Sequence, residues 1–215
     1  MSFKETYLLI AMLTVFIPVG VAFFRYKYLS LVLRALMYFL AFSFLFDVKH
    51  YIVWLVPYRS YFTVTFSIFQ FLFYLWFLRK TAPQMQFFKH YKVTMAAFIV
   101  LWCFCYVPLL FGHNVLWQRA LFEVSQAILL SLLSAFALLD LTKSGQIVYE
   151  HVYFRFFLGI FVYFFMNMFL YAFMHASFRN SIWALHSIFD ILKNLLFLLG
   201  FLMATNKTQY QKAQL

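Results

Sequence analysis

Charged residues are scarce in this chain, and acidic residues are the scarcest. Only 11% of the 215 residues are charged, with six Asp and Glu against seventeen Lys and Arg. A soluble domain needs roughly 25% charged residues to cover its surface. The shortage therefore excludes a soluble globular fold, and the remaining composition, 66% hydrophobic and 25% aromatic, favours an integral membrane protein.

Cysteine is nearly absent. The two cysteines, Cys103 and Cys105, stand two residues apart within an apolar run, and a disulfide between such close neighbours is strained. No further ligands accompany them at the spacing that zinc sites use. We expect neither a disulfide framework nor a metal or other cofactor, and both residues should behave as small buried hydrophobic groups.

Nucleic-acid motifs are missing as well, although the formal net charge is +11. In a membrane protein such a charge is typical of turns that face an anionic cytoplasmic leaflet. Because no motif of a DNA- or RNA-binding fold accompanies it, the charge predicts the lipid bilayer as a partner and no nucleic acid.

Apolar runs of about 20 residues recur along the chain. A helix of about 20 residues crosses the roughly 30 Å of a bilayer core, whereas barrel strands are about half as long. The sequence predicts an all-α polytopic membrane protein, a single seven-helix domain over 1–205 with a short polar tail at 206–215. The first run lacks a small-residue cleavage site, so we expect it to remain as a helix. The predicted segments are about Thr6–Phe24, Tyr28–His50, Tyr61–Leu78, Val93–Phe111, Leu116–Leu141, Phe154–Met174 and Ser181–Thr205.

Basic residues divide unequally between the two sets of turns. One set carries ten Lys and Arg and the other carries five, while Arg34 and Lys193 lie inside helices. By the positive-inside rule, we expect the N-terminus outside and the C-terminus in the cytoplasm, in a multi-pass protein of the cell inner membrane. The most basic turn, RKTAPQMQFFKHYK from Arg79 to Lys92, is interpreted either as an orientation signal or as a docking patch for a cytoplasmic partner or anionic lipid.

The last segment carries the most unusual residues for a membrane span. His186, Asp190, Lys193 and Asn194 follow offsets of i, i+4, i+7 and i+8, which place them on one helical stripe. Lipid cannot solvate these groups, so the stripe should face protein or a water-filled cavity. Asp190 and Lys193 are spaced to neutralise each other. The stripe is either a functional site or polar glue that holds helices together.

Other polar residues are predicted at a similar depth, in the outer half of the membrane. Arg119 and Glu123, at i and i+4, are also spaced to pair with each other. Convergent polar groups among aromatic walls are typical of small-ligand pockets. The expected ligand-binding residues are His186, Asp190, Lys193, Asn194, Glu123, Asn167, Asp47 and Gln126.

Three chemistries fit parts of this pattern. Ser43-x-x-x-Asp47 and His186-x-x-x-Asp190 resemble motifs of seven-helix zinc hydrolases of the ceramidase and adiponectin-receptor kind, which have His where this chain has Asp. A chain of acid, His and Lys across a bundle could relay protons in a small transporter, although no internal repeat is evident. A retinal site at Lys193 is disfavoured by comparison with microbial rhodopsins. Those proteins have an Asp four residues before the retinal-binding Lys, whereas Asp190 precedes Lys193 by three, and their Arg and Asp pattern is missing from the third segment.

Two stretches carry a family resemblance. HSIFDILKN, from His186 to Asn194, and YKYLSLVLRAL, from Tyr26 to Leu36, resemble an uncharacterised seven-helix inner-membrane protein family of Bacteroidota. That family is associated with histidine-kinase signalling. It would have Asn in place of Asp190 and an acid near Gln70. The resemblance implies a signalling context and no particular reaction.

Together these patterns predict a membrane sensor or signalling accessory protein rather than an enzyme. A small ligand or a lipid would bind in the outer-half polar pocket, and the basic turns would contact a cytoplasmic or membrane signalling partner. A homo-oligomer is left open. The alternatives are a small transporter or channel and, third, a metal-dependent membrane lipid hydrolase.

Overall fold

The computed structural model describes residues 3–48, 59–111, 116–143, 151–172 and 179–212, and within these ranges the chain is helical apart from short turns, with no strand. Two 3₁₀ turns, η1 (Tyr26–Tyr28) and η3 (Gln86–His90), precede α3 and α5. The helices are α1 (Phe3–Thr14), α2 (Phe16–Phe24), α3 (Leu31–Val48), α4 (Arg59–Thr81), α5 (Tyr91–Leu110), α6 (Leu116–Lys143), α7 (Phe154–Ala172) and α8 (Arg179–Lys212).

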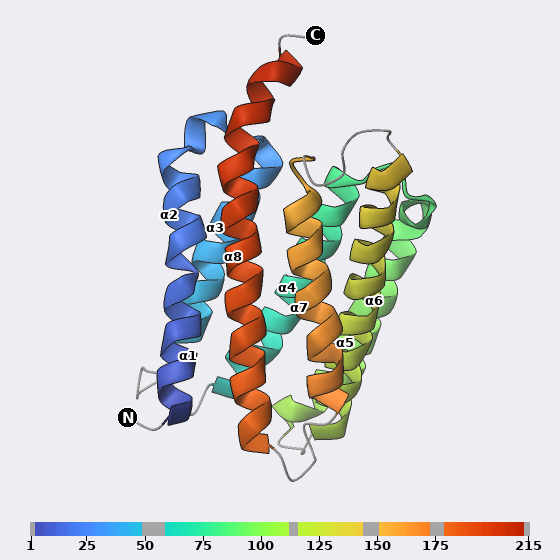
Figure 1. Ribbon diagram of the computed structural model, residues 1–215. Coiled ribbons are helices and arrows are strands. Elements are labelled where there is room, and N and C mark those ends of the chain that lie inside the picture. The colour runs from blue at the N-terminus through green and yellow to red at the C-terminus, as the bar shows by residue number, and fades with distance from the viewer. Residues whose placement is uncertain (1–2, 49–58, 112–115, 144–150, 173–178, 213–215) are drawn as a thin grey trace.

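The helices stand side by side as one bundle (Figure 1). The closest pairings join α6 to α7, α7 to α8, and α8 to both α1 and α2, so α8 packs between the α1–α2 column and α7. α1 begins at one end of the bundle and α8 finishes at the opposite end. We call the latter the basic end, because its turns and helix ends carry Arg25, Lys27, Arg79, Lys80, Lys89, Lys92, Lys143 and Arg155.

α1 and α2 follow one line but are separate helices, whereas the sequence predicts one segment over Thr6–Phe24. Pro18 has no N–H to donate to the carbonyl of Thr14, and its ring crowds that carbonyl. The helix therefore breaks at Val15, whose N–H bonds to the Met12 carbonyl three residues back at 3.4 Å. Thr14 Oγ1 donates to the Ala11 carbonyl at 2.6 Å. The polar side chain of Thr14 therefore faces the bundle at the break, in the middle of an apolar column.

Five helices are long and apolar enough to cross a membrane among the residues described, and this part of the prediction is confirmed. Two further apolar stretches are shorter: Leu9–Phe24, which crosses the break at Val15, and Leu31–Phe46. The protein is therefore a helical membrane protein. The five spans are Tyr61–Thr81, Gln86–Pro108, Trp117–Lys143, Phe154–Tyr171 and Leu185–Ala204.

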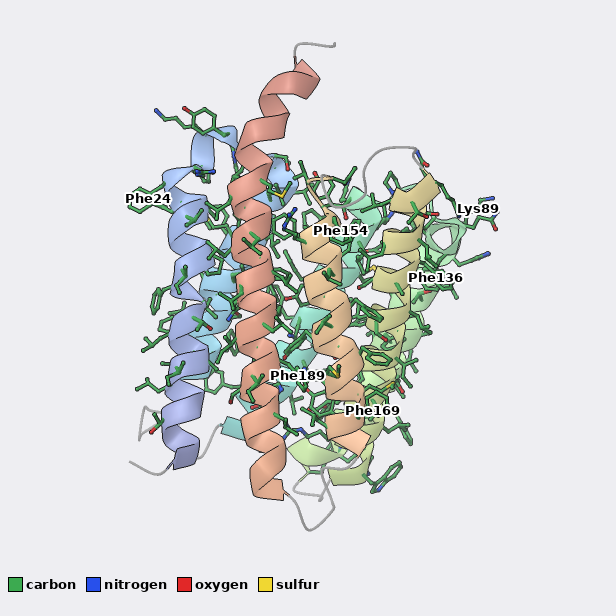
Figure 2. All side chains as sticks on the ribbon, viewed as in Figure 1. Phe24, Lys89, Phe136, Phe154, Phe169 and Phe189 are labelled. Atoms are coloured by element: carbon green, nitrogen blue, oxygen red, sulfur yellow. The ribbon has the colours of Figure 1, made fainter. Side chains whose placement is uncertain are left out.

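Apolar side chains cover the outside of the bundle. Phe136 of α6 and Phe169 of α7 project outward (Figure 2), and about half of each is exposed. On α8 the exposed stripe is aliphatic while the opposite side holds polar groups and phenylalanine, the reverse of a helix on a soluble protein. Such a surface fits lipid. Over 185–204, where the side chains of α8 are described, the exposed residues are Leu185, Ile188, Leu192, Leu195, Leu199 and Leu202.

α7 and α8 pack through two reciprocal glycine contacts. A Cβ on Gly159 would lie 2.8 Å from the Phe197 ring, and a Cβ on Gly200 would lie 2.6 Å from the Phe156 ring. Each helix therefore inserts a fully buried ring against a glycine of the other. These contacts fix the position of α8 against α7. α8 also continues to Lys212, so the stretch predicted as a polar tail begins inside a helix.

Candidate functional site

The polar stripe of α8 meets α7 in a connected network. His186 Nδ1 lies 2.6 Å from Asn167 Oδ1 and, since an amide oxygen only accepts, Nδ1 is the donor. His186 Nε2 lies 3.4 Å from Asp190 Oδ2. Lys193 Nζ donates to Asp190 Oδ1 at 2.7 Å. Both carboxylate oxygens of Asp190 are therefore engaged, one by each neighbouring turn of α8.

Tyr163 completes this network from α7. The Lys193 ammonium lies 4.1 Å from the centre of the Tyr163 ring, a distance at which a cation is attracted to the ring face. The Tyr163 backbone carbonyl accepts from Asn167 Nδ2 at 2.8 Å, one turn further along α7. One turn of α7 and two turns of α8 thus build the site. We call these five residues the α8 cluster: Tyr163, Asn167, His186, Asp190 and Lys193.

Burial makes the α8 cluster costly to disrupt. Asn167 is fully buried, and the side chains of Lys193 and Asp190 are 10% and 25% exposed. Charges inside a membrane protein persist where opposite charge and hydrogen bonds compensate them. The cluster can hold one cation and one carboxylate together, offer both to a ligand, or pass protons between adjacent titratable groups.

Asn194 belongs to a different contact. Its Nδ2 donates to Thr14 Oγ1 at 3.0 Å, at the break between α1 and α2. Its Oδ1 is buried without a hydrogen-bond partner among the residues described. The predicted stripe therefore divides: His186 and Lys193 contact α7, with Asp190 paired to both of them, whereas Asn194 contacts the α1–α2 column.

Glu123 and Gln126 lie on α6 and are buried. Arg119 Nε donates to Glu123 Oε1 at 2.7 Å, so the i, i+4 pair forms. Glu123 Oε2 and Gln126 Oε1 have no hydrogen-bond partner in the described part of the chain. Tyr171 on α7 interacts electrostatically with both Glu123 and Asp190.

The remaining predicted ligand residue, Asp47, lies in α3, and its side chain is outside the described part of the structure. Ser43, its partner in the zinc-hydrolase comparison, donates to the Leu40 carbonyl at 2.8 Å. The residues described contain no group of three or more His, Cys, Asp and Glu that could hold a metal ion. Cys103 and Cys105 are free, and Cys105 is buried.

Three contributors were not predicted from sequence. Tyr163 stands one turn before Asn167, and that i, i+4 spacing of two polar-tipped residues is the signal that could have found it. Thr14 precedes Pro18 by four residues, which marks a helix break. Tyr74 of α4 is buried, its hydroxyl has no hydrogen-bond partner among the described residues, and it interacts electrostatically with Lys193 and Asp190. A tyrosine in an apolar run gives no such indication.

We compared the chain with known proteins. No model of a protein family, no curated protein and no solved structure matches this chain.

Proposed function

We propose that this chain is a membrane sensor or signalling accessory protein, and that the α8 cluster is the site that responds to a small ligand or lipid. The observation that carries the proposal is the position of the cluster on α8. That helix runs without interruption from Arg179 to Lys212 and so connects the cluster to the basic end. Near that end, Arg25 Nη1 donates to the Leu202 carbonyl at 2.9 Å.

The mechanism is a shift between two arrangements of α8. A ligand that binds Asp190 or Lys193 competes with the pair they form together, and it favours the arrangement in which the pair is opened. Since α8 is one helix, a rotation or translation at the cluster moves the residues around Leu202. The coupling between the two ends is then the difference in ligand affinity between the two arrangements.

The unpartnered polar atoms indicate what such a ligand offers. Of these atoms, Glu123 Oε2 and Gln126 Oε1 of α6 are oxygens that accept hydrogen bonds. A ligand with N–H or O–H donors satisfies them, and the aromatic side chains of α7 provide apolar contact. A small molecule with ammonium or hydroxyl groups fits this chemistry.

The proposed setting follows the charge distribution. With the basic end in the cytoplasm of the inner membrane, the α8 cluster lies in the outer half, the N-terminus is outside, and the signalling partner contacts the basic end. The resemblance of HSIFDILKN and YKYLSLVLRAL to the Bacteroidota family supports a partner from a histidine-kinase system. A second copy of the chain is an alternative partner.

The test is native mass spectrometry with metal analysis on protein released in mild detergent. We compare the wild type with Asp190→Asn and with Asp140→Asn, a control that alters a pair of the same spacing at the basic end. We expect a small molecule or lipid to remain bound to the wild type and Asp140→Asn and to be lost from Asp190→Asn. Equal retention by all three proteins contradicts the proposal, and one metal ion per chain supports the hydrolase instead.

One observation favours a second candidate, proton-coupled transport. His186, Asp190 and Lys193 form an uninterrupted series of titratable groups, with neighbours 3.4 and 2.7 Å apart. Such a series is suited to a proton relay. A transporter would move protons across proteoliposomes at a rate that falls in His186→Gln, measured with an enclosed pH-sensitive dye. A flux equal to that of empty liposomes contradicts this candidate.

A further inference from the structure

The turn between α4 and α5, at the basic end, encloses an open hollow of about 420 Å³. Its polar lining consists of three cations, Arg79, Lys80 and Lys89, and two amides, Gln84 and Gln86, with no acidic side chain. Because the lining is cationic and lacks an acid, it is suited to an anion. The volume falls within the range of small-ligand pockets, about 300–1,000 Å³.

The turn is held in place by its own apolar residues. Met85, Phe88 and Tyr91 are each less than 10% exposed and belong to the main core. Because a 3₁₀ turn has three residues per turn, this spacing of three puts one face into the core and leaves Gln86 and Lys89 on another. The Phe88 N–H bonds to the Met85 carbonyl at 3.0 Å. Lys89 projects away from the bundle (Figure 2).

Among the described residues, no acidic side chain forms an ion pair with the cations of the hollow. The side chains of Lys80 and Lys89 make no ion pair or hydrogen bond within the described ranges. The Arg79 guanidinium lies 4.2 Å over the Tyr91 ring, a contact that leaves its N–H groups available for a bidentate anion. At the same end of the bundle Lys143 is occupied, since it donates to Asp140 at 2.9 Å.

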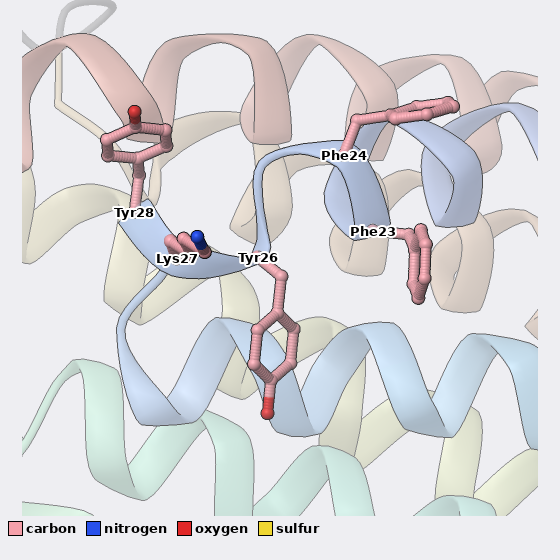
Figure 3. A pocket seen from close by; sticks show the side chains of 5 residues that line it. All are labelled: Phe23, Phe24, Tyr26, Lys27 and Tyr28. Atoms are coloured by element: carbon pink, nitrogen blue, oxygen red, sulfur yellow. The ribbon is translucent and has the colours of Figure 1, made fainter.

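We infer that the hollow lies near the depth of lipid headgroups, from its place between two apolar spans. It falls between two membrane spans, Tyr61–Thr81 and Gln86–Pro108, at the point where one finishes and the next begins. A second hollow at the same end, about 380 Å³ in the turn between α2 and α3, is lined by aromatic residues and the single cation Lys27 (Figure 3). The two hollows lie in different turns at the same end of the bundle and are similar in size, but they differ in charge.

We propose that the hollow of the α4–α5 turn binds the phosphate of an anionic phospholipid. Arg79 donates two parallel N–H groups to the phosphate oxygens, Lys80 and Lys89 supply further positive charge, and the apolar surface of the adjacent spans receives the acyl chains. This site is separate from the α8 cluster and does not depend on the function proposed for it.

The test is a titration of the full chain in mild detergent with dioleoyl phosphatidylglycerol or dioleoyl phosphatidylcholine, with bound lipid counted by native mass spectrometry. We expect phosphatidylglycerol to bind more tightly than phosphatidylcholine. Each cation removed should weaken phosphatidylglycerol binding roughly fivefold at low salt, so Lys80→Gln/Lys89→Gln should lose about 25-fold. Lys80→Arg/Lys89→Arg should bind like the wild type. The matched control, Lys27→Gln, removes a cation from the second hollow and should change binding less than twofold.

Three results overturn the proposal. Equal binding of the two lipids would show that the hollow does not recognise the anion. A fivefold loss in Lys27→Gln, the loss expected for each cation of the hollow, would show a general attraction to the basic end rather than a site. Displacement of phosphatidylglycerol by millimolar inorganic phosphate would show a site for soluble phosphate. A monodisperse elution profile and an unchanged unfolding midpoint of the glutamine variant ensure that lost binding reports on the hollow.

Discussion

Two ion pairs of identical composition and spacing stand in different regions of this molecule. Asp190 and Lys193 lie three residues apart on α8 with 2.7 Å between their charged atoms, and Asp140 and Lys143 lie three residues apart on α6 with 2.9 Å. The first pair is inside the bundle, where the Lys193 side chain is 10% exposed. The second is at the basic end, where the Lys143 side chain is 77% exposed.

The comparison shows that sequence spacing determines whether an ion pair forms, whereas its surroundings determine how much the pair contributes to stability. An exposed pair is worth about 0–1 kcal/mol, because water and ions compete for both charges. The buried pair has further partners in His186 and the ring of Tyr163. Removing one partner of such a pair leaves an uncompensated charge among apolar groups, which costs about 3–5 kcal/mol.

The largest expected effect comes from breaking the buried pair. Lys193→Met removes the cation and leaves the buried Asp190 carboxylate without its ammonium partner, so we expect the free energy of unfolding to fall by about 3–5 kcal/mol. Lys143→Met, the matched control, should cost less than about 1 kcal/mol. The measurement is the denaturant-induced unfolding of both variants in mild detergent, followed by tryptophan fluorescence.

A double variant sharpens the same comparison. Lys193→Met/Asp190→Leu removes both charges and should regain much of the stability, since a buried pair can be replaced by apolar residues at little cost. If Lys193→Met and Lys143→Met lose the same stability, the buried position of the first pair has no energetic consequence.

A second effect, of intermediate size, tests the packing that holds the buried pair in place. A Cβ on Gly200 would lie 2.6 Å from the Phe156 ring, so Gly200→Ala forces α7 and α8 apart and should cost about 1–3 kcal/mol. At Gly20 nothing lies within 4 Å of the corresponding position, and Gly20→Ala is the control. That control should leave the thermal unfolding midpoint unchanged or raise it slightly, because alanine favours the helix. Equal shifts in both variants would contradict the close approach of α7 and α8.

Much of the fold could be predicted from the sequence, because apolar length and polar spacing act within a single helix. Five predicted spans are present, and the i, i+4 pair of Arg119 and Glu123 forms. The break at Val15 could not be predicted from Pro18, because membrane helices often tolerate proline. The sequence alone does not distinguish a tolerated proline from one that interrupts the helix. The extension of α8 to Lys212 was missed because polar residues mark the end of a membrane span but not the end of a helix.

The composition of the site could be predicted only in part, because the sequence indicates depth along a helix but not direction around it. The stripe on α8 was evident, yet its division between α7 and the α1–α2 column depends on how α8 is rotated. That rotation is set by rings packed against Gly159 and Gly200, a contact between distant parts of the chain. For the same reason Tyr163 could not be recognised as the ring that faces Lys193.

The smallest expected effect concerns the contact between the Tyr163 ring and Lys193. The exposed pair on α6 has no such contact among the residues described. Tyr163→Leu keeps apolar volume but removes the face that lies 4.1 Å from Lys193 Nζ, and a partly desolvated cation–π contact is worth about 0.5–2 kcal/mol. Tyr163→Phe keeps the face and should retain more than half of that contribution. The decisive measurement repeats both substitutions in the Lys193→Met background, where no cation remains. There Tyr163→Leu should cost less than it does in the wild type, and the difference between the two costs is the coupling between ring and ammonium. A coupling near zero would mean that Tyr163 contributes only its apolar surface and that the buried pair is held by His186 and by burial alone.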